Sequence, residues 1–272
     1  MLWCIAATFR IIPSLQAPSE QRSARHPVLA VLDVFTSLRE QAFRILFFST
    51  LMFNVLAGVS LTLLVYVATY VFGFDSKQLA LLSTSPLMGI LLASTIAQAL
   101  SRKFDKRLAS GMCALLGAAL SSTPMLLFLA GAFDSMDLTP KLWLVYLFNG
   151  AAQGFFIAFV ILLDSMLSDT ADEHEINTGR REEGLFFAAR SFATKASYGL
   201  GSFIAGIALD LIAFPRGAAP ADVGADSVNR LAIVAGPVLT VLFVFVLIIL
   251  RRYPLDAARY QQIKMALQRQ AR

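Results

Sequence analysis

The sequence predicts an all-α membrane protein built on a bundle of six transmembrane helices. Hydrophobic residues make up 57% of the 272-residue chain and charged residues only 15%, whereas soluble domains carry about 25% charged residues. Six long apolar runs follow one another, and each is long enough to cross a hydrocarbon core of about 30 Å as a helix. The alternation in segments of about ten residues that marks membrane β-barrels is absent from the sequence.

The chain divides into four parts. Residues 1–14 are expected to be the end of a preceding helix or an interfacial stub, because a bilayer-spanning helix needs about 20 apolar residues. Residues 15–43 form a polar cytoplasmic linker, with a short surface helix over 27–41. The bundle occupies 44–250, and 251–272 form a basic cytoplasmic tail. The six spans are predicted at about 44–74, 79–101, 108–132, 142–167, 184–214 and 231–250.

Three of these predicted spans contain a proline. Pro86, Pro124 and Pro237 fall within the second, third and sixth runs. Membrane helices tolerate proline but are commonly kinked by it, so we expect irregular helix geometry at these positions.

The distribution of positive charge predicts the orientation. Of the 23 Lys and Arg residues, two lie within an apolar run, at Arg190 and Lys195. The connections on one side of the predicted membrane carry only Lys77, Lys141, Arg216 and Arg230, and all the others lie on the opposite side. Because cytoplasmic loops are enriched in Lys and Arg, both termini are expected in the cytoplasm, with the chain in the inner (plasma) membrane of a bacterium.

No catalytic or metal-binding pattern favours an enzyme. The sequence lacks a phosphate loop, a paired-histidine metal motif and a Gly-x-Ser-x-Gly motif. His174 lies among Asp172, Glu173 and Glu175, but adjacent residues on a helix do not converge on one ion. We therefore expect no enzymatic activity, no bound metal and no cofactor in this chain. The basic residues flank apolar runs, so topology explains them better than nucleic-acid binding.

Lys195 is the sharpest candidate for contact with a transported solute. It follows Gly184 by eleven residues, or roughly 16 Å of helix, which places it near the middle of the membrane. A charge at that depth is expected to face a polar cavity or a carboxylate. Ser191 and Tyr198 share its helix face. Arg190 is nearer the surface, and lining the cavity and forming a salt bridge both remain open for it.

Two amides one turn apart in the fourth run, Asn149 and Gln153, are further candidates. Hydrogen bonds between helices and contact with a solute both remain open for them. The polar stretch that follows the fourth run is predicted to be a cytoplasmic loop. Its acidic and basic residues, with the basic turn at 102–107, could form ion pairs that open and close a gate; a solvated loop is the alternative. The gating candidates are Asp164, Asp169, Asp172, Arg180 and Arg181.

The stretch SDTADEHEINTGRREEGLFFAARSFATKASYGLGSFIAG, residues 168–206, resembles a known family. It is similar to the cytoplasmic loop and eleventh helix of the glycoside-pentoside-hexuronide:cation symporters, the melibiose permease group of the major facilitator superfamily. Tyr66-Val-Ala-Thr-Tyr70 resembles the family's seventh helix, and RKFDKR at 102–107 its turn between helices eight and nine. The residues that match the loop pattern are Asp169, Asp172, Glu175, Thr178, Gly179, Arg181, Glu183 and Gly184.

The resemblance implies that the six spans are helices seven to twelve, the C-terminal half of such a transporter, with residues 1–9 as the end of helix six. Lys195 falls on the family's lysine in the sugar cavity. The carboxylates that bind the coupling cation, sodium or a proton, belong to the N-terminal half, which would be a partner of this chain. Arg190 stands where melibiose permeases have a neutral polar residue, which argues against a galactoside and favours an anionic solute.

The function expected from the sequence is secondary active transport: cation-coupled symport of a sugar or related small solute by alternating access. This chain would be a C-terminal half or a truncated product, working in the lipid bilayer with a six-helix N-terminal half. The alternative is a stand-alone six-helix membrane protein that handles lipids or acts as an assembly partner.

Overall fold

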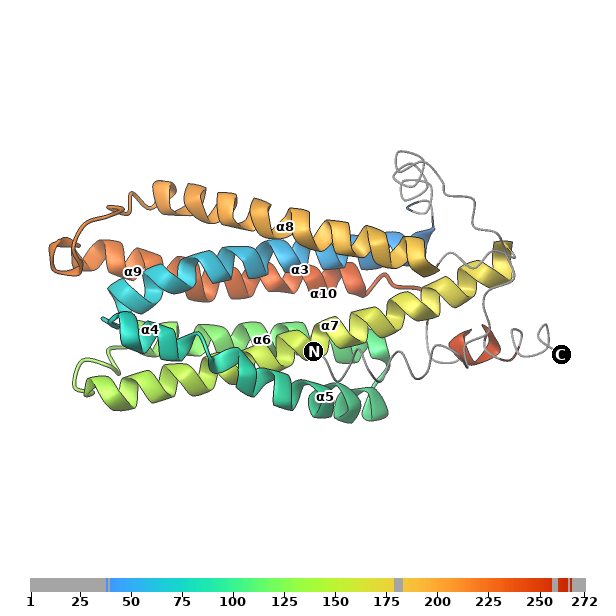
Figure 1. Ribbon diagram of the computed structural model, residues 1–272, viewed down its shortest axis with the longest axis horizontal. Helices are drawn as coiled ribbons and strands as arrows, with labels where there is room; N and C mark the ends of the chain where they lie inside the picture. Colours follow the sequence, from blue (N-terminus) through green and yellow to red (C-terminus); the bar gives the residue numbers. More distant parts are fainter. Residues whose placement is uncertain (1–37, 39, 179–182, 256–258, 264, 266–272) are drawn as a thin grey trace, which may run out of the picture.

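A computed structural model describes residues 40–178, 183–255 and 259–263, together with Leu38 and Met265. These described residues form a bundle of helices that run roughly parallel or antiparallel to one long axis (Figure 1). The elements are α3 Gln41–Tyr66, η2 Val67–Val71, α4 Ser76–Leu82, α5 Ser85–Lys103, α6 Lys106–Leu129, α7 Leu138–Thr178, α8 Glu183–Leu211, η3 Pro220–Asp222, α9 Ala225–Ile233, η4 Val234–Val238 and α10 Leu239–Leu250.

Five stretches of the described chain are long and apolar enough to cross a membrane, which confirms an all-α membrane bundle. They are Gln41–Val71, Ser76–Lys103, Lys106–Leu129, Leu138–Ile176 and Ala225–Leu250. The sixth predicted span, 184–214, forms α8. Its 29 residues extend over roughly 40 Å. Arg190, Lys195 and Asp210 make it more polar than the others, so its insertion in the membrane stays a prediction.

The polar stretch after the fourth run was predicted to be a loop, and this prediction is wrong for its first part. Helix α7 continues through it to Thr178 and is 41 residues long. None of the polar side chains in this stretch interrupts the backbone hydrogen bonds of the helix. Ala171 is buried, so its side of the extension packs on the rest of the bundle. Arg180 and Arg181 lie outside the described residues, as does the surface helix expected over 27–41 except at its end.

The three prolines have different effects. Pro86 lies at the start of α5, after a turn that divides the second predicted span into α4 and α5, where its missing N–H is not needed. Pro237 lies within the π-helical segment η4, whose wider turn accommodates the lost backbone hydrogen bond. Helix α6 continues through Pro124. A second π-helical segment, η2, extends α3 without a proline.

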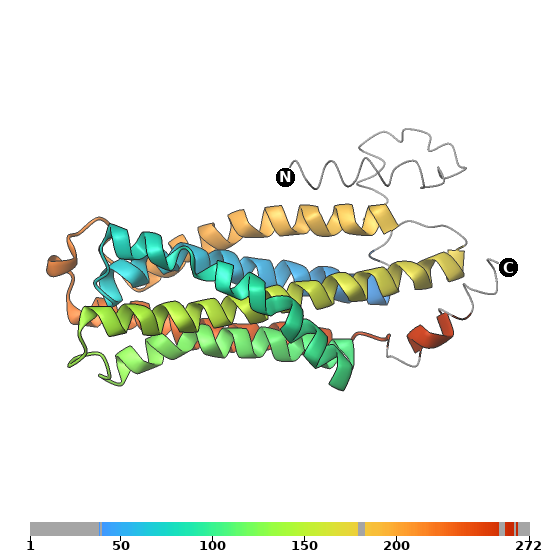
Figure 2. The same cartoon turned by 60° about the horizontal axis from the view of Figure 1, so that its bottom comes forward.

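The helices form two layers. α8, α3 and α10 lie on one side in Figure 1 and α5, α6 and α7 on the other, with α10 packed against both α3 and α6. Figure 2 shows α5 crossing α7 obliquely. At this crossing a Cβ on Gly89 would lie 2.7 Å from the backbone nitrogen of Gly154. Only glycine allows the two backbones to come so close, as is common between membrane helices.

Helices α3 and α8 approach each other equally closely. A Cβ on Gly58 would lie 2.9 Å from the carbonyl oxygen of Tyr198, and one on Gly201 would overlap α3. Two hydrogen bonds join the helices beside this contact: Asn54 Nδ2 donates to Thr194 Oγ1 at 3.3 Å, and Thr62 Oγ1 donates to Ser202 Oγ at 3.0 Å.

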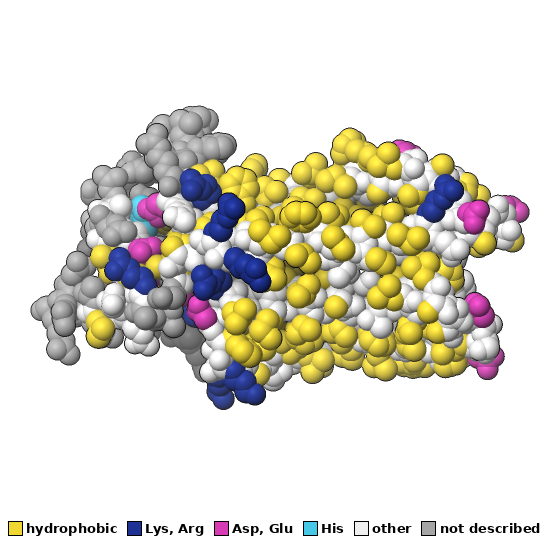
Figure 3. All heavy atoms as spheres, turned by 180° about the vertical axis from the view of Figure 1, so that it is seen from behind, with side chains coloured by type: hydrophobic (Ala, Val, Ile, Leu, Met, Phe, Trp, Pro, Cys, Tyr) yellow, Lys and Arg dark blue, Asp and Glu magenta, His cyan; other side chains and the backbone are white. Residues whose placement is uncertain are grey.

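Basic side chains gather at one end of the bundle (Figure 3). We call the end that carries the 102–107 turn and Arg251–Arg252 the basic end, and the other the far end. The middle of the bundle exposes mainly hydrophobic side chains between these two polar ends, as expected of a protein that spans a bilayer.

Candidate functional site

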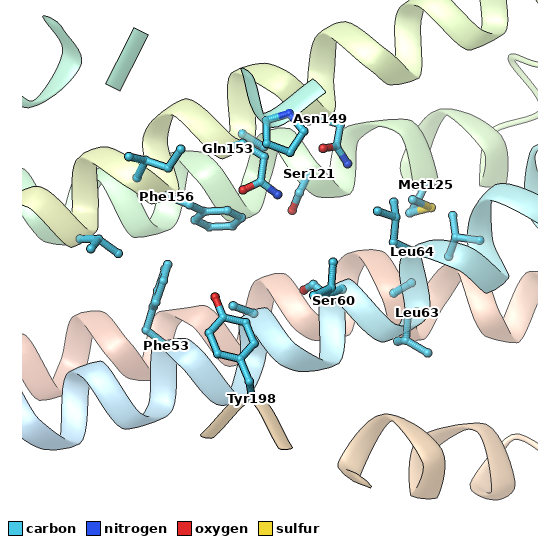
Figure 4. Close-up of a pocket in the computed structure, with 18 residues that line it drawn as sticks. Phe53, Ser60, Leu63, Leu64, Ser121, Met125, Asn149, Gln153, Phe156 and Tyr198 are labelled. Carbon is cyan, nitrogen blue, oxygen red and sulfur yellow. The ribbon is translucent and has the colours of Figure 1, made fainter. Parts of the chain in front are cut away.

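A cavity of about 360 Å³ lies between the two layers, midway along the bundle (Figure 4). Its size falls within the range of small-molecule sites. Helices α3 and α7 supply most of its walls, and η2, α5, α6, α8 and η4 complete them. The lining residues are Phe53, Ala57, Ser60, Leu61, Leu63, Leu64, Val67, Pro86, Ser121, Met125, Asn149, Ala152, Gln153, Phe156, Ile157, Val160, Tyr198 and Ala235.

A cluster of aromatic rings packs beside the cavity on the side nearer the basic end. Phe53 contacts Phe156 edge to face, with ring centroids 5.6 Å apart, and packs against Phe159 at 4.3 Å. Phe156 also stacks on Phe243 of α10 at 5.2 Å. These contacts join α3, α7 and α10, and we call these four rings the aromatic cluster.

Five uncharged polar side chains face the cavity. Asn149, Gln153 and Ser121 come from the layer of α6 and α7, and Ser60 and Tyr198 come from the opposite layer (Figure 4). These groups can exchange hydrogen bonds with a hydroxylated solute while the apolar walls contact its carbon skeleton.

The two amides of α7 have different partners. Asn149 Oδ1 accepts a hydrogen bond of 3.0 Å from Ser85 Oγ on α5, which fixes the amide and leaves its NH₂ group as a donor. Gln153 makes no side-chain hydrogen bond within the described part of the chain. Asn149 therefore makes one of the interhelical hydrogen bonds that the sequence left open, and both amides line the cavity, while their contact with a solute stays a prediction.

Only part of the predicted face of α8 lines the cavity. Tyr198 lines it and is 40% exposed, whereas Ser191 and Lys195 are exposed and do not belong to its lining. Arg190 forms an ion pair with Asp164 on α7, with Nε 2.7 Å from Oδ1. The salt bridge that remained open for Arg190 is therefore present, and it involves a residue that we expected to act in gating.

A second ion pair lies at the basic end. Nζ of Lys106, the first residue of α6, donates to both carboxylate oxygens of Asp169, at 2.9 and 2.6 Å. The ammonium group of Lys106 also lies 4.8 Å from the centre of the Tyr260 ring. This joins the 102–107 turn to the acidic extension of α7, as the sequence suggested. Asp172 lies half-buried one turn further along α7.

The segment after α10 packs against the same region, which sequence reasoning missed. The hydroxyl of Tyr253 donates to the carbonyl oxygen of Met166 at 3.0 Å and lies 3.0 Å from Thr170 Oγ1. Arg107 Nη1 donates to the carbonyl oxygen of Tyr253 at 3.2 Å. Burial raises the pKa of the Tyr253 phenol, which keeps its proton available for donation. The position of Tyr253 just after an apolar helix was the only feature of the sequence that pointed to this contact.

Comparison with known proteins agrees with this architecture. The family described as MFS/sugar transport protein matches residues 1–257. An uncharacterized symporter of Synechocystis sp. is similar to this chain, at 26% identity over 162 residues, which cover 56% of this chain and 26% of the relative. The chain thus spans about a quarter of the length of that relative. Because the family match covers nearly the whole sequence, the chain belongs to the MFS/sugar transport protein family of the major facilitator superfamily.

Proposed function

We propose that this chain forms one wall of the solute pathway of a secondary transporter, which moves a sugar or related small solute by alternating access. The observation that carries the proposal is the cavity between α3 and α7. It lies midway along the bundle and combines hydrogen-bonding groups with apolar walls, which include Phe53 and Phe156 of the aromatic cluster. Transporters of this kind bind their substrates near the middle of the membrane.

The basic end is proposed to face the cytoplasm. Its Lys and Arg residues outnumber those of the far end, and such an excess marks cytoplasmic loops. In this orientation both ends of the sequence lie on the cytoplasmic side, and the inner membrane of a bacterium is the proposed location. The aromatic cluster would then lie on the cytoplasmic side of the cavity.

A second six-helix half is proposed to complete the cavity. Two residues at its rim, Leu61 and Tyr198, are 61% and 40% exposed, so the cavity has an open side. The lining supplied by the described residues contains no carboxylate. We therefore assign the coupling cation, sodium or a proton, to the facing half, and propose that Lys195, which is exposed on α8, is directed at that half.

The two ion pairs fit a gate at the basic end. Asp169 links α7 to Lys106, and Asp164 links α7 to Arg190 on α8. Both pairs join helices of this half, so the opening of such a gate would move α7 against α6 and α8 and break them. Asp172 of α7 and Arg180 and Arg181 are proposed to take part with them.

The proposal is tested by uptake measurements with the transporter that contains this chain, reconstituted in proteoliposomes. Uptake of radiolabelled glucose, galactose and xylose is measured with and without an imposed sodium or proton gradient. Replacing Gln153→Ala is expected to lower uptake about tenfold, the effect of one lost hydrogen bond to the solute. Gln98→Ala, an exposed glutamine of α5 outside the cavity, is the matched control and should be close to unchanged.

Two results would contradict the proposal. Equal uptake by the two glutamine variants would remove the cavity from the pathway. Absence of uptake for every sugar, with folded protein in the vesicles, would favour the alternative of a stand-alone membrane protein that handles lipids or assists assembly.

A further inference from the structure

We propose that the basic end carries a binding site for one anionic phospholipid, in the groove between the start of α6 and the end of α10. The phosphate of the lipid lies against the guanidinium groups of Arg107, Arg251 and Arg252, and its acyl chains follow the exposed apolar side chains of the two helices. None of these arginines lines the cavity between α3 and α7, so the lipid site is separate from the proposed solute site.

The fold brings together arginines from two distant parts of the chain. Arg107 lies at the start of α6, and Arg251 and Arg252 directly follow α10. Arg107 Nη1 donates to the carbonyl oxygen of Tyr253 at 3.2 Å and to that of Arg251 at 3.4 Å. The guanidinium of Arg107 therefore lies beside the turn that carries the other two arginines.

The positive charge of these arginines is not neutralised within the described part of the chain. The two partners of Arg107 are carbonyl oxygens, which accept hydrogen bonds but carry no net charge. Among the described residues, none of the three arginines forms an ion pair with a carboxylate, whereas the neighbouring Lys106 is paired with Asp169. Arg102 and Lys103 at the end of α5 add further positive charge, and Asp105 in the same turn offsets one unit of it. An anion placed in this groove would thus meet an excess of positive charge.

The arginines lie where the hydrophobic surface of the bundle ends, and Figure 3 shows basic side chains at this border. Leu108 is the next residue on α6, and Ile248 lies in the last turn of α10; both side chains are exposed. The two helices are in contact beside them, because a Cβ on Gly111 of α6 would overlap the side chain of Leu247 of α10. The groove therefore offers an apolar surface for acyl chains directly next to a positive surface for a phosphate.

A phospholipid with net negative charge fits this groove better than a zwitterionic one. Arginine binds phosphate oxygens through two parallel N–H groups. The choline or ethanolamine group of a zwitterionic lipid would place a second positive charge among the arginines, whereas the glycerol headgroup of phosphatidylglycerol adds only hydroxyls. Basic pockets between membrane helices on the cytoplasmic side bind acidic headgroups.

The test compares ligands that differ only in the headgroup or in the chains. The transporter that contains this chain is purified in a mild detergent and titrated with dioleoyl phosphatidylglycerol or dioleoyl phosphatidylcholine. Native mass spectrometry measures how many lipids bind and how tightly. At least one phosphatidylglycerol is expected to bind at least tenfold more tightly than phosphatidylcholine. Glycerol phosphate, which has the charge without the acyl chains, is expected to bind at least a hundredfold more weakly than phosphatidylglycerol.

Matched variants assign the lipid to the groove. Arg251→Gln combined with Arg252→Gln is expected to weaken binding of one phosphatidylglycerol at least tenfold and to leave phosphatidylcholine within twofold. Both side chains are exposed, so the fold should tolerate their replacement. The control is Lys77→Gln combined with Arg230→Gln, which changes the net charge equally at exposed residues of the far end. Phosphatidylglycerol binding by this control should stay within twofold of the parent protein.

Four results would overturn the inference. They are equal affinity for the two lipids, unchanged phosphatidylglycerol binding by the Arg251 and Arg252 variant, and an equal loss in the far-end control, which would indicate attraction to positive charge anywhere on the protein. The fourth is glycerol phosphate binding as tightly as the lipid, which would assign the groove to a free phosphate. None of these results depends on sugar uptake, so the proposed function is tested separately.

Discussion

Replacing Gly201 tests whether α8 packs against α3 as described. A Cβ at this position would lie 2.9 Å from the Cα of Gly58 and 2.9 Å from the backbone nitrogen of Val59, and would overlap the carbonyl oxygen of Val55. All of these atoms belong to the backbone, so no side-chain rotation can relieve the contact. Gly201→Ala must therefore move the two helices apart.

The magnitude follows from two contributions. Overpacking of a close interface costs about 1–3 kcal/mol. Separation of α3 from α8 also weakens the hydrogen bonds from Asn54 to Thr194 and from Thr62 to Ser202, and each such bond contributes about 0.6 kcal/mol in a membrane protein. We expect a loss of about 2–4 kcal/mol in the free energy of unfolding.

The control lies two residues away on the same helix. A Cβ on Gly199 meets nothing within 4 Å, and alanine is the better helix former by about 1 kcal/mol. Gly199→Ala should therefore leave stability unchanged or raise it slightly. Both variants are purified in detergent, and unfolding is followed by circular dichroism on heating and in denaturant. Equal stability of the two variants would refute the packing of α8 on α3.

Two further predictions concern the polar contacts. Asp164→Asn should destabilise the protein by about 2 kcal/mol because Arg190 loses its partner carboxylate. The double variant with Arg190→Gln should lose less free energy of unfolding than the sum of the two single changes. Strict additivity in this double-mutant cycle would contradict the pairing. Tyr253→Phe should cost about 1 kcal/mol through the lost hydrogen bond to Met166. The pKa of Tyr253 in the folded protein is raised above its unfolded value near 10. The stability that Tyr253 contributes is therefore complete below about pH 10 and is lost as the pH rises through the folded pKa. Denaturation between pH 8 and pH 11 should show this decline in the parent protein and less of it in Tyr253→Phe.

Hydropathy was sufficient to find the helices but not to place their ends. Five of the six predicted runs correspond to apolar spanning helices because the need to bury or cover apolar surface dominates their sequence. The extension of α7 to Thr178 was missed because polar residues in that stretch resemble a loop in composition, while nothing in them breaks a helix. The division into α4 and α5 depends on a local turn beside Pro86, which apolar content alone does not reveal.

The candidate site was predicted in part. Asn149, Gln153 and Tyr198 were singled out as polar groups within apolar runs, and all three line the cavity. The aromatic cluster was not foreseen, since Phe53 and Phe156 are ordinary hydrophobic residues until the fold brings them together. Long-range pairing explains the difference, because a sequence shows which residues are unusual in their surroundings but not which distant residues they meet.

Arg190 illustrates how a partner changes the meaning of a residue. Within an apolar run its charge is costly, and two kinds of partner could offset that cost: a solute or another side chain. In the structure the carboxylate of Asp164, on the preceding helix α7, lies 2.7 Å from Nε of Arg190 and forms an ion pair with it. The charge is thereby used between α7 and α8, the two helices that the proposed gate would move, and no charged side chain of the described residues lines the cavity. A change at Arg190 should therefore alter the packing of α7 and α8 without removing a side chain from the cavity wall.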